Sequence, residues 1–550
     1  MSPQKRNVLI VCIVACIYVA LFIPANLRCS GDVNMLLCTG PDEISDTTGD
    51  EYAQFPHLMS MMMRDTTVLG TVRRVLDHGH YYYGYPFYFV SAVAVLPVRV
   101  LSEFREGDYT RMYVLLLRQL SPLFTAAAIV LLVAMWTRFE NLVGSLSMFA
   151  FLSVMPTVFR NNTWWHPDAM VTFLVVLTLF SLDRDGLRFG KWFLVSAIAC
   201  GLATATKTIG AFFVAAILLY LVIGIYRGQL TPPGALKTGI LFVLTMALSI
   251  LLSYPIILLK SSEILEILRL QSVINTFGWG IQMEKGPLSN YRDILRVGFG
   301  LWPIYILPFV AASVYAKTFD ERLRSVLTLA WVLPFAAYLL FVVAKKQEIY
   351  FIPIMLPLLA VMWCPSLWQI RNRRSVVLVA LLTIGLSVQM SIYILRDVAI
   401  YRSLVTLERN SPSLAFYRSL VQDGLLPLSP ETPVAIFRDA HVYLPPNPKY
   451  QAHMRWGSAD YSDVRFNPEL IILQQDFIQK HSDPLRISIS FDQEQARRSL
   501  PFYTDAKNNQ LKGYTRVLES EFAVAFRKSI QDNSPNQVSE PTSPRSETQR

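Results

Sequence analysis

Long apolar runs recur along most of this chain, and they restrict its fold more than any other feature. The first covers residues 8–24, and similar runs follow one another as far as Leu395. A helix of about 20 apolar residues crosses the roughly 30 Å of hydrocarbon in a bilayer. Hydrophobic residues make up 53% of the 550 residues and charged residues only 16%, whereas about 25% charged residues is usual for soluble domains. The sequence therefore predicts an α-helical polytopic membrane protein.

We predict about eleven transmembrane helices. They cover residues 8–24, 112–136, 141–158, 168–182, 191–206, 209–225, 238–259, 298–316, 325–344, 349–368 and 375–395. The first run follows Lys5 and Arg6 and precedes no small-residue cleavage site, so we expect a retained anchor and not a signal peptide.

A further apolar run, 85–101, is short and contains Pro86 and Pro97, so a count of eleven or twelve is open. Short cytoplasmic loops collect Lys and Arg. If 85–101 lies in the interface, nearly every short basic loop from Arg138 onward faces the cytoplasm. We therefore predict an interfacial helix there, a cytoplasmic N-terminus and a periplasmic C-terminal region in the cell inner (plasma) membrane, with Arg99, Arg105 and Arg111 as exceptions outside.

The composition changes after the last apolar run. We predict a transmembrane domain over 1–396, whose first external loop is 25–111, and a soluble periplasmic α/β domain over 397–530. Short strand-like runs at 433–437, 469–473 and 521–526 support that domain. Residues 531–550 carry a single Val among polar residues, so they cannot form a core and we expect a disordered tail.

Several function classes receive no support. The chain has no P-loop, dinucleotide fingerprint, paired CxxC or HExxH motif. Its net charge of +10 is largely that of the predicted cytoplasmic loops, so no nucleic-acid partner is indicated. Cys29 and Cys38 share the first external loop; a disulfide and two free thiols are both compatible with their spacing.

Ionisable residues gather at the predicted external ends of the helices. Asp50 and Glu51 lie in the first loop, Asp168 follows a Trp-Trp-His-Pro sequence, and Lys207 separates two apolar runs. Arg118 lies inside a predicted span. Charged groups are costly at such positions unless they line a polar cavity, which makes each a candidate functional residue.

The order of these features resembles the GT-C superfamily of polytopic glycosyltransferases, and especially the branch of protein O-mannosyltransferases and lipid A aminoarabinose transferases. The matching segments are "GDEYAQFPHL", "HYYYGYPFYFVSAVAVLP", "LLLRQLSPLFTAAAIVLL", "WWHPDAMVTFLVVLTLFSLDR", "GLATATKTIGAFFVAAILL" and "KKQEIYFIPIMLPLLAV". The resemblance extends over roughly 8–395. It implies a GT-C-like fold and transfer of a monosaccharide from a polyprenyl-phosphate donor, with inversion, to a glycolipid, cell-envelope glycan or protein.

The resemblance also assigns roles. It makes Asp50 the catalytic base, with Glu51 supporting it or helping to hold a divalent metal ion, and Asp168 a second acid. Asp42 and Glu43 are the alternative acidic pair. Ordinary solvated loop charge is the other explanation for either pair.

Positive and aromatic residues complete the predicted site. Lys207, Lys345, Lys346 and Arg118 are candidates for binding the donor phosphate, although interfacial Lys often only extends toward water. His78, His80, Tyr83 and His166 are candidates for contacting sugar or metal, whereas interfacial aromatic residues are also typical of any membrane protein.

A transporter or flippase of lipid-linked sugars is the alternative function. Such proteins often carry polar residues or broken helices near the bilayer midplane, and repeated architecture. Here the middles of most predicted spans are uninterrupted Leu, Val, Ala and Phe, and no internal repeat is evident. The sequence therefore favours an enzyme acting at the membrane surface.

Overall fold

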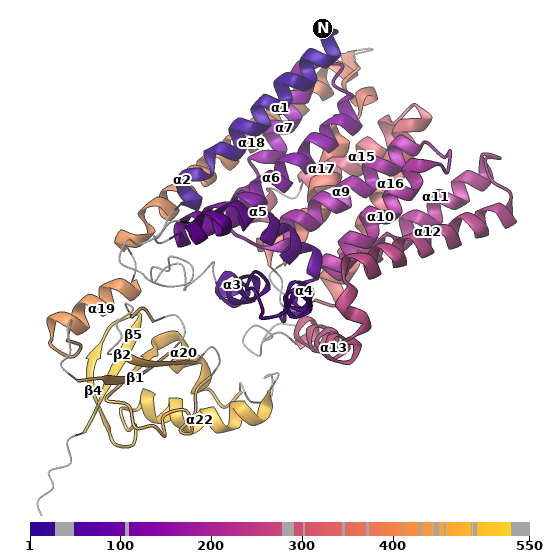
Figure 1. The fold of residues 1–550 in the computed structure, drawn as a ribbon. Helices are drawn as coiled ribbons and strands as arrows, with labels where there is room; N and C mark the ends of the chain where they lie inside the picture. The colour runs from indigo at the N-terminus through magenta and orange to yellow at the C-terminus, as the bar shows by residue number, and fades with distance from the viewer. Residues whose placement is uncertain are drawn as a thin grey trace, which may run out of the picture.

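The computed structural model describes residues 1–27, 49–104, 109–277, 291–300, 303–343, 347–369, 373–410, 412–427, 432–439, 442–444, 450–455, 458–485, 487 and 492–529. These residues form a large helical bundle and a small α/β unit at its far end from the N-terminus (Figure 1).

The first half of the chain is entirely helical where it is described. Its elements are α1 Pro3–Leu21, α2 Ile23–Asn26, α3 Gly49–Met61, α4 Val68–Leu76, α5 Tyr85–Phe104, α6 Thr110–Thr137, α7 Leu142–Ser153, α8 Pro156–Asn161, α9 Pro167–Asp185, α10 Lys191–Thr206, η2 Thr208–Phe213, α11 Val214–Tyr226, α12 Pro232–Ser253, η3 Pro255–Leu258 and α13 Ser261–Phe277. Helices α6, α9 and α10 pack along one another at the centre of the bundle.

The second half of the bundle contains shorter and more broken helices. They are α14 Tyr291–Phe299, α15 Pro303–Val310, the π-helix η4 Ala311–Tyr315, α16 Phe319–Phe341, η5 Glu348–Phe351, α17 Ile352–Ala360, η6 Val361–Trp363, η7 Pro365–Trp368 and α18 Arg373–Asn410. Their buried aromatic side chains join the main core, where Trp331 stacks on Phe213 with ring centroids 4.3 Å apart.

Within the described residues, seven helical stretches are long and apolar enough to cross a membrane. They are Pro3–Asn26, Tyr85–Ser102, Met112–Thr137, Thr208–Tyr226, Pro232–Ser253, Phe319–Phe341 and Val379–Leu404. Six of them coincide with predicted spans, and the seventh contains the run that we expect to be interfacial. In Figure 1 its helix, α5, lies at the end of the bundle beside α3 and α4.

The remaining predicted spans are shorter or interrupted, so the count of eleven stays a prediction. The span expected at 141–158 is not one helix, because α7 ends at Ser153 and Pro156 begins α8. Proline disfavours helical backbone in the residue before it, and Met155 is accordingly extended, at φ −65° and ψ 127°. The 298–316 run breaks at Gly300, whose φ of +109° suits glycine alone.

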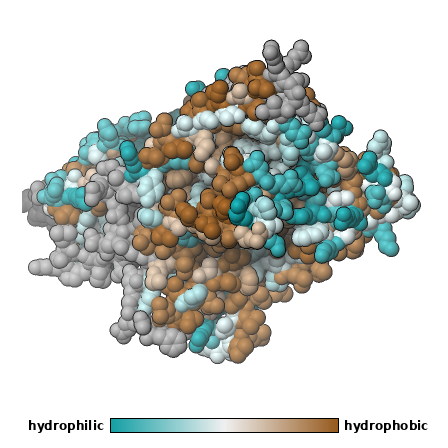
Figure 2. Space-filling model, turned by 90° about the horizontal axis from the view of Figure 1, so that it is seen from above, coloured by the Kyte–Doolittle hydropathy of each residue, from teal (hydrophilic) through white to brown (hydrophobic). Residues whose placement is uncertain are grey.

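Apolar side chains also cover the outside of the bundle. Leu218 and Val222 of α11 and Val243 and Leu244 of α12 are each more than half exposed. Figure 2 shows hydrophobic residues gathered in broad patches over the face that it presents. Such extensive apolar exposure is expected where lipid is the solvent.

The C-terminal unit is a five-stranded sheet with helices. Strands β1 Val434–Asp439, β2 Tyr450–Arg455, β3 Leu470–Gln474, β4 Tyr514–Glu519 and β5 Ala523–Lys528 lie in the order β2-β1-β3-β5-β4. Strands β1, β2 and β3 are parallel, with Val434 opposite Tyr450 and Ile436 opposite Leu470, whereas β5 is antiparallel to β3 and β4. Helices α19 Pro412–Gln422, α20 Gln475–His481 and α22 Gln493–Lys507 accompany the sheet. The predicted α/β architecture is confirmed, and β1, β3 and β5 coincide with the three predicted strand runs.

Helix α18 joins the two parts. Its 38 residues correspond to about 57 Å at 1.5 Å per residue, which exceeds the roughly 30 Å of membrane hydrocarbon. The helix continues through position 397, where we predict the soluble domain to begin, so that boundary stays a prediction. The predicted tail at 531–550 lies outside the described residues.

Candidate functional site

The acidic pair of the first loop lies in the first turn of α3. Asp50 and Glu51 are both helical, although the side chain of Asp50 is outside the described part of the structure. Glu51 is 1% exposed. Helix α3 therefore carries the Glu51 side chain into contact with the bundle.

Arg118 of α6 holds the Glu51 carboxylate with two hydrogen bonds. Its Nε donates to Oε1 at 3.0 Å and a terminal nitrogen donates to Oε2 at 2.7 Å, and the Arg118 side chain is fully buried. The backbone N–H of Trp165 also donates to Glu51 Oε1, at 2.7 Å. Bidentate Arg–carboxylate pairs are among the strongest and most directional hydrogen-bonded contacts in proteins. This pair fixes α3 to α6 and to the segment before α9.

Asp168, in the first turn of α9, faces two positive or polar partners. Lys207 Nζ donates to its Oδ1 at 2.5 Å, and His166 Nδ1 lies 2.5 Å from its Oδ2. Asp168 is fully buried, but the Lys207 side chain keeps 21% of its surface exposed. Tyr350 of η5 presents its ring to the same ammonium group, 4.9 Å away. Lys207 is thus oriented by Asp168 and Tyr350 while part of it stays accessible.

His166 links this ion pair to the loop that precedes α5. The Tyr83 hydroxyl and His166 Nε2 are 2.8 Å apart, and the imidazole stacks on the Trp164 indole at 4.2 Å between centroids. We call Tyr83, His166, Asp168 and Lys207, with Glu51 and Arg118, the candidate site. Its members come from α3, α6, α9, the end of α10 and two connecting loops.

Close backbone packing fixes the loop that carries Tyr83. Gly84 N donates to the Thr206 carbonyl at 3.0 Å, and a Cβ at Gly84 would lie 1.5 Å from the Ala205 carbonyl oxygen. Only glycine fits where the loop meets the C-terminal end of α10. His78 Nε2 donates to the Tyr83 carbonyl at 3.0 Å, which closes the loop on itself.

Polar contacts tie the same loop to α13. Lys260 Nζ lies 2.9 Å from Asp77 Oδ2 and donates to the Tyr81 hydroxyl, also at 2.9 Å. The Tyr81 hydroxyl donates to Asp77 Oδ1 at 2.5 Å. Sequence reasoning missed Asp77 and Lys260, since nothing in the local pattern of either residue indicates the other.

Aromatic side chains surround the two predicted loop histidines, of which His78 is buried and His80 is half-buried. Tyr88 shares a 2.6 Å hydrogen bond with His80, whose ring lies 5.2 Å from that of His57 of α3. Burial lowers the pKa of His78 to about 4 and that of His80 to about 3. Both imidazoles are therefore neutral near pH 7. Each forms a hydrogen bond, His78 with the Tyr83 carbonyl and His80 with the Tyr88 hydroxyl.

The described residues do not test whether the site holds a divalent metal ion, because the Asp50 side chain is not among them. They contain no group of three or more His, Cys, Asp or Glu side chains arranged to hold a metal ion. Glu51 accepts two hydrogen bonds from Arg118 and one from Trp165, so both of its oxygens are already engaged.

Several predicted residues lie outside the described part of the chain. They are Cys29, Cys38, Asp42, Glu43, Lys345 and Lys346. Their roles stay predictions. Arg118 is directed at Glu51 in this structure, so its predicted contact with a donor phosphate also stays a prediction.

Solved structures provide the comparison with known proteins. ArnT from Cupriavidus metallidurans, bound to undecaprenyl phosphate, is 12% identical, with a TM-score of 0.51 over 95% of this chain and 98% of that chain. The archaeal oligosaccharyltransferase AglB from Archaeoglobus fulgidus, in complex with an inhibitory peptide and a dolichol-phosphate, is 12% identical, with a TM-score of 0.51 over 98% of this chain and 76% of that chain. Both proteins belong to the GT-C superfamily. No family model and no curated protein matches the sequence.

Proposed function

Because this chain has the GT-C fold, we propose that it is an integral membrane glycosyltransferase that moves a monosaccharide from a polyprenyl-phosphate carrier to an acceptor. The observation that carries the proposal is the shared fold together with the candidate site at one end of the bundle. Structures of that fold have been solved with undecaprenyl phosphate and with a dolichol-phosphate. The acceptor is a glycolipid, a cell-envelope glycan or a protein, and the site faces the periplasmic side of the inner membrane.

The proposed reaction is a single displacement. Asp50 takes the proton of the acceptor hydroxyl or amine as the acceptor atom forms its bond to the anomeric carbon. The bond between that carbon and the phosphate oxygen breaks, and its electron pair leaves with the polyprenyl phosphate. One displacement inverts the anomeric centre. Asp50 is suited to this role by its position, one residue before the anchored Glu51.

Lys207 is the proposed partner of the leaving phosphate. Its ammonium group donates one hydrogen bond to Asp168 and is partly accessible, so its other N–H groups can meet an anionic oxygen. A cation fixed in advance stabilises negative charge that develops on a leaving group. Asp168 keeps Lys207 in place, and the N–H groups that Asp168 does not accept are left for the phosphate.

Glu51 and Arg118 are proposed positioning residues. Their buried ion pair, with the Trp165 N–H, determines where the first turn of α3 meets the α8–α9 connection. A displacement of about 1 Å at a reacting group can cost on the order of 100-fold in rate. The pair therefore supports Asp50 through geometry and not through proton transfer.

The proposal is tested with the purified protein in lipid nanodiscs, a panel of polyprenyl-phosphate sugars and a panel of acceptors. Replacement of Asp50 by Asn should lower transfer by about 10²- to 10⁴-fold and leave thermal stability unchanged, whereas Asp42→Asn should retain activity. Loss of transfer in Asp42→Asn alone would reassign the base to Asp42. Absence of transfer with every donor, combined with movement of intact lipid-linked sugar across vesicle membranes, would favour the transporter alternative.

A further inference from the structure

A cavity of about 470 Å³ lies in the C-terminal unit, between helices α20 and α22 and strands β4 and β5. Pockets that bind small molecules usually have volumes of about 300–1,000 Å³. The floor of the cavity is apolar, because Ile478, Ala506 and Val524 are buried in the core on this face of the sheet. Its lining residues are all distinct from those of the candidate site. We call it the C-terminal cavity.

Six polar or charged side chains form the wall and rim of the C-terminal cavity. They are Gln475, Gln479, Lys507, Arg516, Glu519 and Glu521. Gln475 and Arg516 are half-buried, and the other four residues are exposed. The cavity therefore combines an apolar floor with hydrogen-bonding groups that solvent and a dissolved ligand can reach.

A β-bulge directs two of these side chains to the same side of the sheet. Arg516 of β4 lies opposite Phe526 of β5. Glu519 lies opposite Val524, and both partners on β5 belong to the core that faces α20 and α22. Residues three apart on a regular strand point to opposite faces. The extra residue of the bulge, Val517, reverses this alternation and brings a positive and a negative group together beside the cavity.

Hydrogen bonds hold the Glu519 carboxylate between two donors. Arg516 donates to its Oε2 at 2.6 Å, and Gln475 Nε2 donates to its Oε1 at 2.8 Å. A second terminal nitrogen of Arg516 donates to the Lys507 carbonyl at 3.4 Å. A guanidinium group has five N–H donors and a carboxylate has about four acceptor sites, so both groups keep capacity for a ligand. Groups that are ordered in advance lose less entropy when a ligand binds.

We propose that the C-terminal cavity binds a neutral sugar unit. The charges of its wall balance, because Lys507 and Arg516 are positive while Glu519 and Glu521 are negative, so a charged ligand gains no net attraction. Each hydroxyl of a sugar ring both donates and accepts hydrogen bonds, and the C–H face of the ring is apolar like the floor. Planar guanidinium and carboxylate groups can contact two neighbouring hydroxyls at once.

The role of this sugar site rests on the proposed function, whereas sugar binding itself does not. A sugar transferase with a second sugar-binding site outside its candidate site can hold part of its acceptor there. The C-terminal cavity therefore makes the acceptor a glycan, carried by a lipid or by the cell envelope, and not a protein.

The first test measures binding to the full-length protein in nanodiscs, without any donor, by saturation-transfer NMR. The neutral probes are the methyl glycosides of glucose, galactose, mannose and N-acetylglucosamine, and the charged probes are glucuronate and glucosamine. At least one neutral glycoside should bind saturably and more tightly than the charged probes. Absence of binding by every neutral glycoside, or tighter binding of a charged probe, would overturn the proposal.

Variants locate the binding in the cavity. Arg516→Gln should lower the affinity for that glycoside by about tenfold or more. Gln479→Ala, at an exposed position of the rim, should also weaken binding and provides a second variant if Arg516→Gln is unstable. Arg498→Gln, at an exposed arginine of the same domain outside the cavity lining, should keep the wild-type affinity. Wild-type affinity in both cavity variants would overturn the proposal.

The second test addresses the acceptor role in the transfer assay. Arg516→Gln should raise the KM for a glycan acceptor far more than it lowers kcat, because the cavity contacts the acceptor away from the reacting atoms. An unchanged KM would overturn the acceptor role. Absence of transfer by the wild-type protein would instead contradict the proposed function, and the binding result would stand by itself.

Discussion

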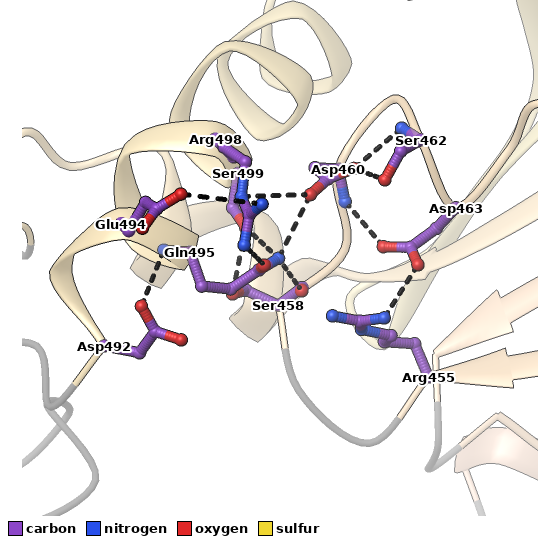
Figure 3. A network of polar contacts seen from close by, with 10 residues as sticks. All are labelled: Arg455, Ser458, Asp460, Ser462, Asp463, Asp492, Glu494, Gln495, Arg498 and Ser499. Carbon is purple, nitrogen blue, oxygen red and sulfur yellow. Dashed lines mark hydrogen bonds and ion pairs between the residues drawn. The ribbon is translucent and has the colours of Figure 1, made fainter.

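The candidate site and the C-terminal domain each contain a network of charged and polar side chains, but the two networks differ in burial. The Glu51–Arg118 pair joins residues 67 apart, and both side chains are at most 1% exposed. The network in Figure 3 joins the loop after β2 to the first turns of α22 and includes exposed residues such as Arg498. There Gln495 donates to the Ser458 carbonyl at 2.9 Å, and Arg455 pairs with Asp463 at 2.8 Å.

This difference changes what each network contributes. A buried charge that loses its partner stays desolvated, which costs several kcal/mol. An exposed pair is already solvated, so its loss changes stability by less than about 1 kcal/mol. The candidate-site network therefore specifies how helices fit together, whereas the exposed pairs of the C-terminal network contribute little to stability.

Removal of the Arg118 side-chain charge should lower the free energy of unfolding more than any other change proposed here. Arg118→Met leaves the buried Glu51 carboxylate without its main partner and should lower the free energy of unfolding by about 3–5 kcal/mol. Thermal unfolding in nanodiscs measures this change, as a lower unfolding midpoint or as loss of the transition. Arg138→Met, which breaks an exposed pair with Asp320, is the matched control and should cost less than about 1 kcal/mol. The double variant Glu51→Gln/Arg118→Met should recover part of the loss. Equal effects of Arg118→Met and Arg138→Met would contradict the comparison.

The next largest effect is a pH dependence of stability that arises in the loop before α5. Burial lowers the pKa of His78 to about 4, from an ordinary value of 6.5. The unfolded chain takes up this proton near pH 6.5 while the folded chain resists it, so stability should fall by about 2–3 kcal/mol as pH drops from 6.5 toward 4.

His78→Gln keeps an N–H donor but does not titrate, and it should reduce this slope. His453→Gln, at an exposed histidine of β2, serves as the control. Thermal unfolding between pH 4 and pH 7 measures the slope; a slope retained in His78→Gln would assign the effect to another group.

The C-terminal domain should show the opposite pH slope. Asp439 at the end of β1 is fully buried, and burial raises its pKa from 3.8 to about 7, although the Gln474 N–H donates to it at 2.7 Å. The folded domain holds the proton longer than the unfolded chain, so its stability should fall by about 1–2 kcal/mol as pH rises from about 5 to 7.

Hydrogen exchange of β1 and β3 amides in the full-length protein can measure this local change. Asp439→Asn should flatten the dependence, whereas Asp492→Asn, at the N-cap of α22, should preserve it. Protection that increases toward pH 7 in the wild type would show that the sign is wrong.

Substitutions in the network of Figure 3 should change the free energy of unfolding least. Arg498 is 56% exposed and lies 3.9 Å from Asp460 and 3.8 Å from Glu494. Arg498→Gln should change the free energy of unfolding by less than about 0.5 kcal/mol. A loss comparable to that of Arg118→Met would mean that burial does not distinguish the two networks.

Much of the architecture was predictable because its signals are local. Apolar runs located six of the seven long hydrophobic helices, and short strand-like runs located β1, β3 and β5. Strands β2 and β4 were missed, since "YQAHMR" and "YTRVLE" contain few apolar residues and lie at the two edges of the sheet. The break before Pro156 was missed because the hydrophobicity of the segment continues through it.

The sequence predicted which residues belong to the candidate site but not which of them contact one another. Charged groups in the first loop, at helix ends and inside one span identified Glu51, Arg118, Asp168 and Lys207, because a membrane protein rarely keeps such groups without a partner. Their pairing was not predictable. The sequence did not indicate that Arg118 pairs with Glu51, and Lys260 received no role until the structure placed it beside Asp77.

By itself, the sequence determined that the chain is a polytopic helical membrane protein with a small α/β domain, and which charged residues need explanation. Hydrophobic periodicity and desolvation cost are properties of short segments, so they can be read along the chain. Tertiary structure alone decided which carboxylate meets which cation. Those outcomes depend on the packing of helices separated by tens to hundreds of residues, and no local pattern encodes that packing.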